Sequence, residues 1–154
     1  MRTLRLAALA LAVAGALAAC GSMQPGSMSS GTMTSGAASN MASMVSELSA
    51  RNEVPPNASA GTGRATVTMD RSTRVLTWSV AYSGLTGPAT GAHIHTGAEG
   101  ANGPVTIPFT LSPSPITGSA TLTEAQAQQL AAGQMYVNIH TAANPGGEIR
   151  GQLR

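Results

Sequence analysis

Three histidines, His93, His95 and His140, are the residues of this chain whose type and spacing best suit chemistry. Neutral imidazole is a common ligand of zinc and copper, and residues two apart on a β-strand project from the same face of the sheet. His93 and His95 would then be separated by about 6.5 to 7 Å at the backbone, so both rings can reach one ion. His140 supplies a third ligand if its strand pairs alongside. The spacing therefore predicts a copper or zinc site built from these three side chains.

The apolar residues beside the histidines predict which way the rings point. Ile94 separates the first two histidines, and Val137 and Ile139 precede the third on alternate positions. If these three aliphatic residues face the core, all three histidines point away from it. None of the three histidines is then an ordinary histidine packed in the core. The remaining alternative is a polar strand face that simply meets solvent.

Glu148 is expected to emerge near His140, because the turn of residues 144–147 brings the chain back there. It could be a fourth ligand, an acceptor for an imidazole N–H, or a salt-bridge partner of Arg150. We rank the salt bridge first. The same histidines are the only strong bases, and no set of nucleophile, base and orienting group can be assembled around them, so an enzyme is not expected.

The elements that position these residues are strands. Apolar and polar residues alternate between glycine, proline and asparagine breaks over about 110 residues, which is typical of short antiparallel strands. The pattern predicts an all-β fold, an antiparallel Greek-key-like β-sandwich of about eight short strands, with Leu76, Trp78 and Val80 facing the core. The strands are expected at residues 45–50, 62–70, 74–82, 89–96, 104–110, 115–122, 134–141 and 147–153.

One short helix is expected near residues 123–132. Thr123 and Gln126 have the spacing of a capping box, in which each side chain bonds the other residue's backbone amide. Gly133 supplies the left-handed stop at the other end.

The N-terminus has the features of an exported lipoprotein. Arg2 and Arg5 precede an apolar run over residues 6–19, and Cys20 is the only cysteine. A charged start, a short apolar run and small residues before the cleavage point are typical of a secretory signal peptide. Leu-Ala-Ala-Cys also resembles the lipobox of bacterial lipoproteins. We therefore expect residues 1–19 to be removed, Cys20 to be lipidated, and the protein to be anchored to a bacterial membrane on the periplasmic side or at the cell surface. A signal peptide cut near a chance cysteine is the alternative.

Charge argues against a nucleic-acid partner. The chain has eight basic and six acidic residues. Removal of Arg2 and Arg5 with the signal peptide leaves six of each and a net charge of zero. No basic patch remains to attract a polyanion.

Residues 20–43 are rich in Met, Ser and Gly and contain no charged or aromatic residue. Such a composition cannot bury enough apolar surface to fold, so we expect a disordered tether, followed by a single domain over residues 44–154. Met23, Met28 and Met33 recur every five residues. The repeat is either low-complexity sequence or a set of soft thioether ligands for Cu(I).

Four blocks of the domain resemble a known family. They are ELSARNEVPP at residues 47–56, GAHIHTG at 91–97, YVNIHT at 136–141 and NPGGEIRGQ at 144–152. In this order they resemble the CHRD domain, which is named for chordin and is also found alone in exported bacterial proteins. The resemblance implies an extracytoplasmic binding domain, since the CHRD domains of chordin belong to an extracellular antagonist that binds growth factors.

A second, more distant similarity is to copper/zinc superoxide dismutase, an eight-stranded Greek-key sandwich. Its Gly-x-His-x-His strand resembles residues 91–95, and its later histidine before a Gly-Gly loop resembles His140. That similarity implies that His93, His95 and His140 are copper ligands on the outer face of the sheet. The chain lacks a fourth histidine, recognisable zinc-site ligands and a cysteine pair, so dismutase activity is not expected.

Three functions follow from these patterns. The default is a tethered module that binds protein or polysaccharide through its loops. The alternative is copper or zinc binding for storage, delivery or sensing. A redox enzyme is least favoured.

Overall fold

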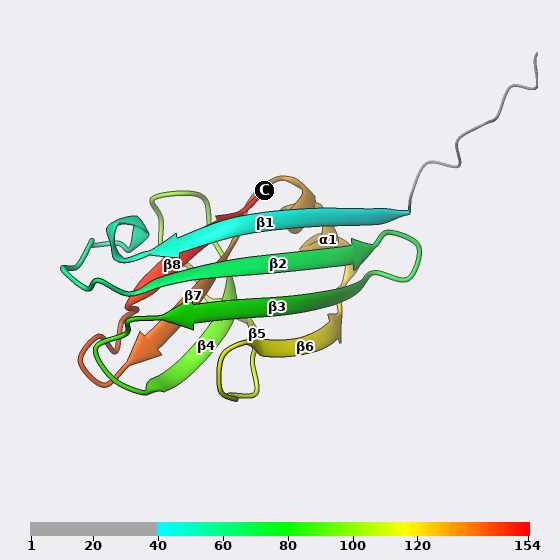
Figure 1. Cartoon of the computed structure of the whole chain (residues 1–154). Helices are drawn as coiled ribbons and strands as arrows, with labels where there is room; N and C mark the ends of the chain where they lie inside the picture. The colour runs from blue at the N-terminus through cyan, green and yellow to red at the C-terminus, as the bar shows by residue number, and fades with distance from the viewer. Residues whose placement is uncertain (1–39) are drawn as a thin grey trace, which may run out of the picture. The chain divides into compact units, whose positions relative to one another are not determined.

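The computed structural model of this chain describes residues 40–154, and the expected signal peptide, Cys20 and most of the tether lie outside them. The described part is built from eight strands and one α-helix, so the all-β prediction is confirmed (Figure 1). The elements are β1 (Met41–Ser49), the short 3-10 helix η1 (Ala50–Asn52), β2 (Thr62–Asp70), β3 (Val75–Ser83), β4 (Ala89–Thr96), β5 (Val105–Pro108), β6 (Ile116–Thr121), α1 (Glu124–Ala131), β7 (Met135–Thr141) and β8 (Ile149–Leu153).

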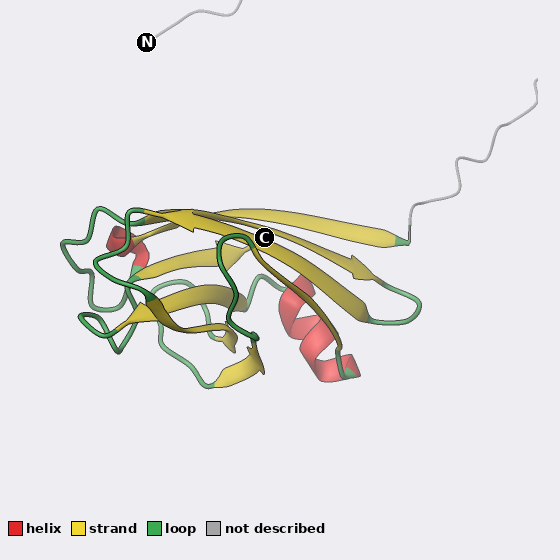
Figure 2. Cartoon of the chain, turned by 60° about the horizontal axis from the view of Figure 1, so that its bottom comes forward, coloured by secondary structure: helices red, strands yellow, loops and turns green. Residues whose placement is uncertain are grey.

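The strands form one continuous sheet in the order β5-β4-β7-β8-β1-β2-β3-β6. Every pairing is antiparallel. The sheet folds over so that the long strands β1, β2 and β3 lie above β4 and β7, with the core between the two layers (Figure 2). A single paired position, Ser49 opposite Arg150, joins β1 to β8 and so connects the layers. The expected sandwich is therefore one sheet wrapped around its core.

The first strand begins before the predicted domain boundary at residue 44. β1 starts at Met41, and residues 41–43 pair with residues 68–70 of β2. Strand pairing uses backbone N–H and C=O groups, so a stretch with little side-chain signal can join the sheet when β2 presents an unpaired edge. Residues 41–43, which the sequence analysis assigned to the tether, therefore belong to β1.

The core contains the residues of β3 that the alternation predicted to be buried. Leu76, Trp78 and Val80 of β3 are buried, as predicted. Trp78 stacks on Phe109 with ring centroids 4.6 Å apart and an interplanar angle of 18°. Stacked aromatic pairs of this kind add to the stabilisation that comes from area burial alone.

Helix α1 lies at the end of the domain where β1 begins (Figure 1). The predicted capping box is present: Thr123 accepts from the Gln126 amide at 3.2 Å, and the Gln126 side chain accepts from the Thr123 amide at 2.8 Å. Gly133 follows with φ of +69°, and Leu130 is buried in the core. Within residues 40–154, no helix is long and apolar enough to cross a membrane.

Candidate metal centre

The three histidines lie on the face of β4 and β7 that points away from the core. Ile94, Val137 and Ile139 are fully buried on the opposite, core-facing side, as the alternation predicted. Antiparallel pairing of β4 with β7 places Gly91 opposite His140 and His95 opposite Tyr136. The missing side chain at Gly91 leaves room there, since a Cβ at this position would lie 3.1 Å from the His93 ring.

The three imidazoles converge. Nδ1 of His93 lies 3.2 Å from Nε2 of His140. One ring nitrogen from each of His93, His95 and His140 lies within 4.8 Å of the others. Two nitrogens bound to one zinc or copper ion at about 2.0 to 2.1 Å are at most about 4.2 Å apart. Small side-chain rotations therefore suffice to bring all three onto one ion.

Backbone carbonyls orient two of the rings. Nδ1 of His95 donates to the Gly103 carbonyl at 2.9 Å, and Nδ1 of His140 donates to the Pro145 carbonyl at 3.0 Å. A carbonyl oxygen only accepts, so in the neutral form both rings carry their lone pair on Nε2. Fixing a ligating histidine by its second nitrogen in this way is common in metal sites.

His95 Nε2 is the most informative atom of the cluster. His95 is only 9 % exposed, and its Nε2 is buried without a hydrogen-bond partner. A solvent-facing polar position would leave this nitrogen in contact with water. The alternative of a merely solvated strand face is therefore wrong for His95.

Burial and the neighbouring histidines favour the neutral form of the other two rings. Burial lowers the pKa of His93 below its usual range, and the neighbouring His140 and His95 lower it further. Burial also lowers the pKa of His140, and His95 adds to this, against the opposing effect of the Pro145 hydrogen bond. Neutral imidazole is the form that ligates a metal.

Glu148 does not form the salt bridge ranked first for it, and it is not part of the histidine group in residues 40–154. Its carboxylate is fully buried and accepts from Ser59 Oγ at 2.6 Å, from the Thr86 amide and hydroxyl at 2.7 Å, and from the Thr141 hydroxyl. Within residues 40–154, the salt bridges do not include Glu148 or Arg150. Because β8 starts only at Ile149, Glu148 lies outside the strand and does not share the facing of Arg150. The expected salt bridge was therefore wrong.

Residues that the sequence analysis did not assign to the site form a buried polar layer around the histidines. Tyr136 stacks on His95 with centroids 4.9 Å apart and an interplanar angle of 8°. Asn138 lies opposite His93 and donates to Glu53, which follows η1. The guanidinium carbon of Arg150 lies over the Tyr136 ring, 3.5 Å from its centroid. Tyr136 and Asn138 lie at alternate positions before His140, so the sequence indicated that they face the same side of the sheet. No nearby residue indicated that other segments would bury this side.

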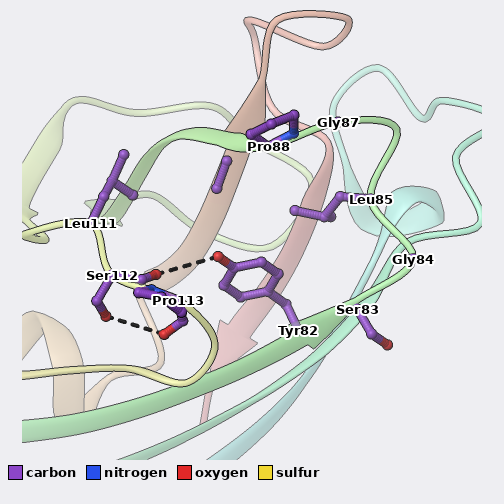
Figure 3. A pocket seen from close by; sticks show the side chains of 10 residues that line it. Tyr82, Ser83, Gly84, Leu85, Gly87, Pro88, Leu111, Ser112 and Pro113 are labelled. Carbon is purple, nitrogen blue, oxygen red and sulfur yellow. Dashed lines mark hydrogen bonds between the residues drawn. The ribbon is translucent and has the colours of Figure 1, made fainter.

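A separate cavity of about 470 Å³ opens between the β3–β4 and β5–β6 connections (Figure 3). The Tyr82 ring lies along it, with its hydroxyl donating to the Ser112 carbonyl at 3.5 Å. None of the three histidines lines this cavity. Its lining is Tyr82, Ser83, Gly84, Leu85, Gly87, Pro88, Ala89, Leu111, Ser112 and Pro113.

Comparison with known families agrees with the motif blocks. The family model of the CHRD domain matches residues 44–153. The chain belongs to the CHRD domain family. Membership supports a binding module whose ligand it does not specify. No curated protein and no solved structure matches the chain, so the likeness to superoxide dismutase remains a prediction from the motif.

Proposed function

We propose that this CHRD domain binds one Cu(II) or Zn(II) ion through His93, His95 and His140. The observation that carries the proposal is the buried, unpartnered Nε2 of His95, in a group of three histidines of which one ring nitrogen each lies within 4.8 Å of the others. A buried acceptor left without a partner costs about 1 to 3 kcal/mol. A bound ion would use this lone pair and remove that cost.

The donor set favours copper over zinc. Three neutral nitrogens suit either ion, and for such ligands the affinity of Cu(II) exceeds that of Zn(II). Within residues 40–154 the cluster contains the three histidines and no carboxylate. Three protein ligands leave a further coordination position for water or for a small molecule. This fits storage, delivery or sensing of the metal, and we do not infer an enzymatic reaction.

We further infer that the domain acts outside the cytoplasm, attached to a membrane through lipidated Cys20. The lipobox and the apolar run before it support this location. An exported chain meets metal ions that are not buffered by the cytoplasm, which fits a binding role at the cell envelope.

Titration calorimetry of the metal-free, untagged full-length protein with Cu(II) and Zn(II) tests the proposal. We expect one saturable site, with most of its affinity lost in His95→Ala and all of it lost in the triple alanine variant. Glu148→Gln serves as the control, because the hydrogen bonds of the Glu148 carboxylate come from Ser59, Thr86 and Thr141 and from none of the histidines. Its affinity should stay within a few-fold of the unmodified protein.

Two results would contradict metal binding. One is the absence of any site tighter than about 10 μM, a weak affinity for three preorganised imidazoles. The other is unchanged affinity in the triple alanine variant. Either result would favour the module that binds protein or polysaccharide, and the cavity beside Tyr82 would be the first surface to mutate.

A further inference from the structure

The connection between β4 and β5, residues 97–104, crosses the polar face beside the histidines. Gly103 belongs to this loop and links two side chains of that face. Its carbonyl accepts from His95 Nδ1 at 2.9 Å, and its amide donates to the Tyr136 hydroxyl at 3.2 Å. The Tyr136 ring also stacks on the His95 ring, with centroids 4.9 Å apart. Tyr136 therefore contacts His95 directly and also holds the peptide that fixes its tautomer.

Arg150 holds the same loop from the next strand. Its guanidinium donates to the Ala98 and Ala101 carbonyls at 3.1 and 2.8 Å and to the Asn102 side-chain oxygen at 3.2 Å. Its central carbon lies 3.5 Å above the centroid of Tyr136. All four contacts join the loop or the ring that orients His95.

The burial of Arg150 is unusual for a charged group. The residue is 2 % exposed, and the salt bridges within residues 40–154 do not include it. Removing a cation from water without pairing it to an anion is unfavourable. Here the compensation comes from two backbone carbonyls and the Asn102 side-chain oxygen of the 97–104 loop, from the aromatic face of Tyr136, and from the charge of the nearby Glu53.

We propose that Arg150 and Tyr136 are positioning residues of the histidine centre, which hold the 97–104 loop so that the Gly103 carbonyl keeps His95 with its Nε2 lone pair directed at the metal. The inference rests on the proposed metal function for its effect on affinity. The fixed tautomer of His95 is expected with or without a bound metal. Support of a ligand by neighbours that do not touch the ion is a general feature of metal sites.

Two variants separate the contributions. Arg150→Met keeps much of the side-chain length and removes every donor, while Tyr136→Phe keeps the stacked ring and removes only the hydroxyl that holds Gly103. Arg154→Met is the matched control. Arg154 is an exposed arginine bound to Glu99 of the same loop at 2.8 and 2.9 Å, and surface pairs of this kind contribute little.

Three readouts are compared in the full-length protein: the Cu(II) affinity, the electron paramagnetic resonance spectrum of bound Cu(II), and the imidazole nitrogen shifts of the metal-free form, which report the tautomer. We expect Arg150→Met to weaken Cu(II) by about 10- to 100-fold, with an altered spectrum and a mixed tautomer at His95. Tyr136→Phe should cause a smaller loss in the same direction, and Arg154→Met should change none of the three.

The outcomes distinguish the inference from the proposed function. If the unmodified protein binds neither ion, the metal function fails, and the nitrogen shifts alone then decide whether His95 is held as the Nδ1–H tautomer. If it binds copper and a folded Arg150→Met matches its affinity and spectrum, the positioning role is wrong. Should Arg150→Met fail to fold, Tyr136→Phe decides: unchanged affinity and an unchanged His95 tautomer would overturn the inference.

Discussion

The side-chain nitrogen of Asn138 donates to both carboxylate oxygens of Glu53, at 2.9 and 3.0 Å, within the buried layer beside the histidines. Glu53 is only 4 % exposed. Burial raises the pKa of Glu53 from its ordinary 4.5 to about 7, although the Asn138 hydrogen bond and the charge of Arg150 act in the opposite direction. The pair therefore makes the stability of the domain depend on pH in a defined way.

Stability contributed by Glu53 is expected to fall as pH rises from 4.5 to about 7. In that range the unfolded chain has released the proton and the folded chain still holds it, so ionisation favours unfolding. The fall should amount to at most about 3 kcal/mol. Chemical denaturation at several pH values should show this fall in stability in the unmodified protein and not in Glu53→Gln. The difference between the two isolates Glu53, because His93 and His140 titrate in both. An identical pH profile for the two proteins would contradict the prediction.

The contribution of Glu148 to stability should change with pH in the opposite direction, and at lower pH. Burial acts to raise its pKa, but hydrogen bonds from Ser59, Thr141 and Thr86 prevail and lower it to about 2. Between pH 2 and its ordinary 4.5 the unfolded chain binds the proton first, so the stability from this group rises with pH and is complete above 4.5. Glu148→Gln should lack that rise and should lose about 1 to 3 kcal/mol at pH 7, because an amide N–H₂ would face donors. Thermal melting checks this, with the exposed Glu47→Gln as control, and equal losses in the two variants would argue against the buried network.

The two neighbouring glycines of the β7–β8 connection should respond differently to alanine. Gly147 has φ of +137°, and a Cβ there would lie 2.6 Å from both Asn138 Nδ2 and Glu53 Oε2. A Cβ added at Gly146 would meet no heavy atom within 4 Å. We expect Gly147→Ala to destabilise the domain by about 1 to 3 kcal/mol, through backbone strain and displacement of the Glu53–Asn138 pair, while Gly146→Ala stays near zero. Denaturant unfolding of both variants provides the comparison, and a harmless Gly147→Ala would show that the loop can shift away from the pair.

Metal binding should weaken as pH falls below about 6, since protonated imidazole cannot ligate. The lowered pKa values of His93 and His140 place the loss below the ordinary histidine value of 6.5. Titrations at pH 7.5, 6 and 5 should therefore show a modest change over the first step and a larger one over the second. Equal affinity at pH 7.5 and 5 would point to ligands other than histidine.

Attachment to the membrane should depend on Cys20. Cys20→Ser should leave the protein uncleaved or release it from the membrane fraction, because the thiol is the acylated group in the lipobox interpretation. Cell fractionation and mass spectrometry of the native N-terminus check this. Unchanged fractionation together with an N-terminus that carries no acyl mass would refute the lipid anchor.

Local geometry was enough to predict much of this domain. Alternation along a strand has a period of two, so the core positions of Trp78 and Ile94 and the outward direction of the histidines could be derived from neighbouring residues alone. The capping box of α1 likewise depends on residues only three apart. The convergence of His140 on His93 required one further assumption, that their strands pair.

Only the tertiary structure decided what covers the outer face of those strands. The 97–104 loop and the segment around Glu53 fold across it and change an expected solvated surface into a buried layer containing Tyr136, Asn138 and Arg150. Glu148 finds Ser59 and Thr86 at sequence separations of 89 and 62 residues, and not the nearby Arg150. The partners of a buried charged side chain depend on how segments distant in sequence pack around it. The spacing of residues along the chain does not indicate that packing.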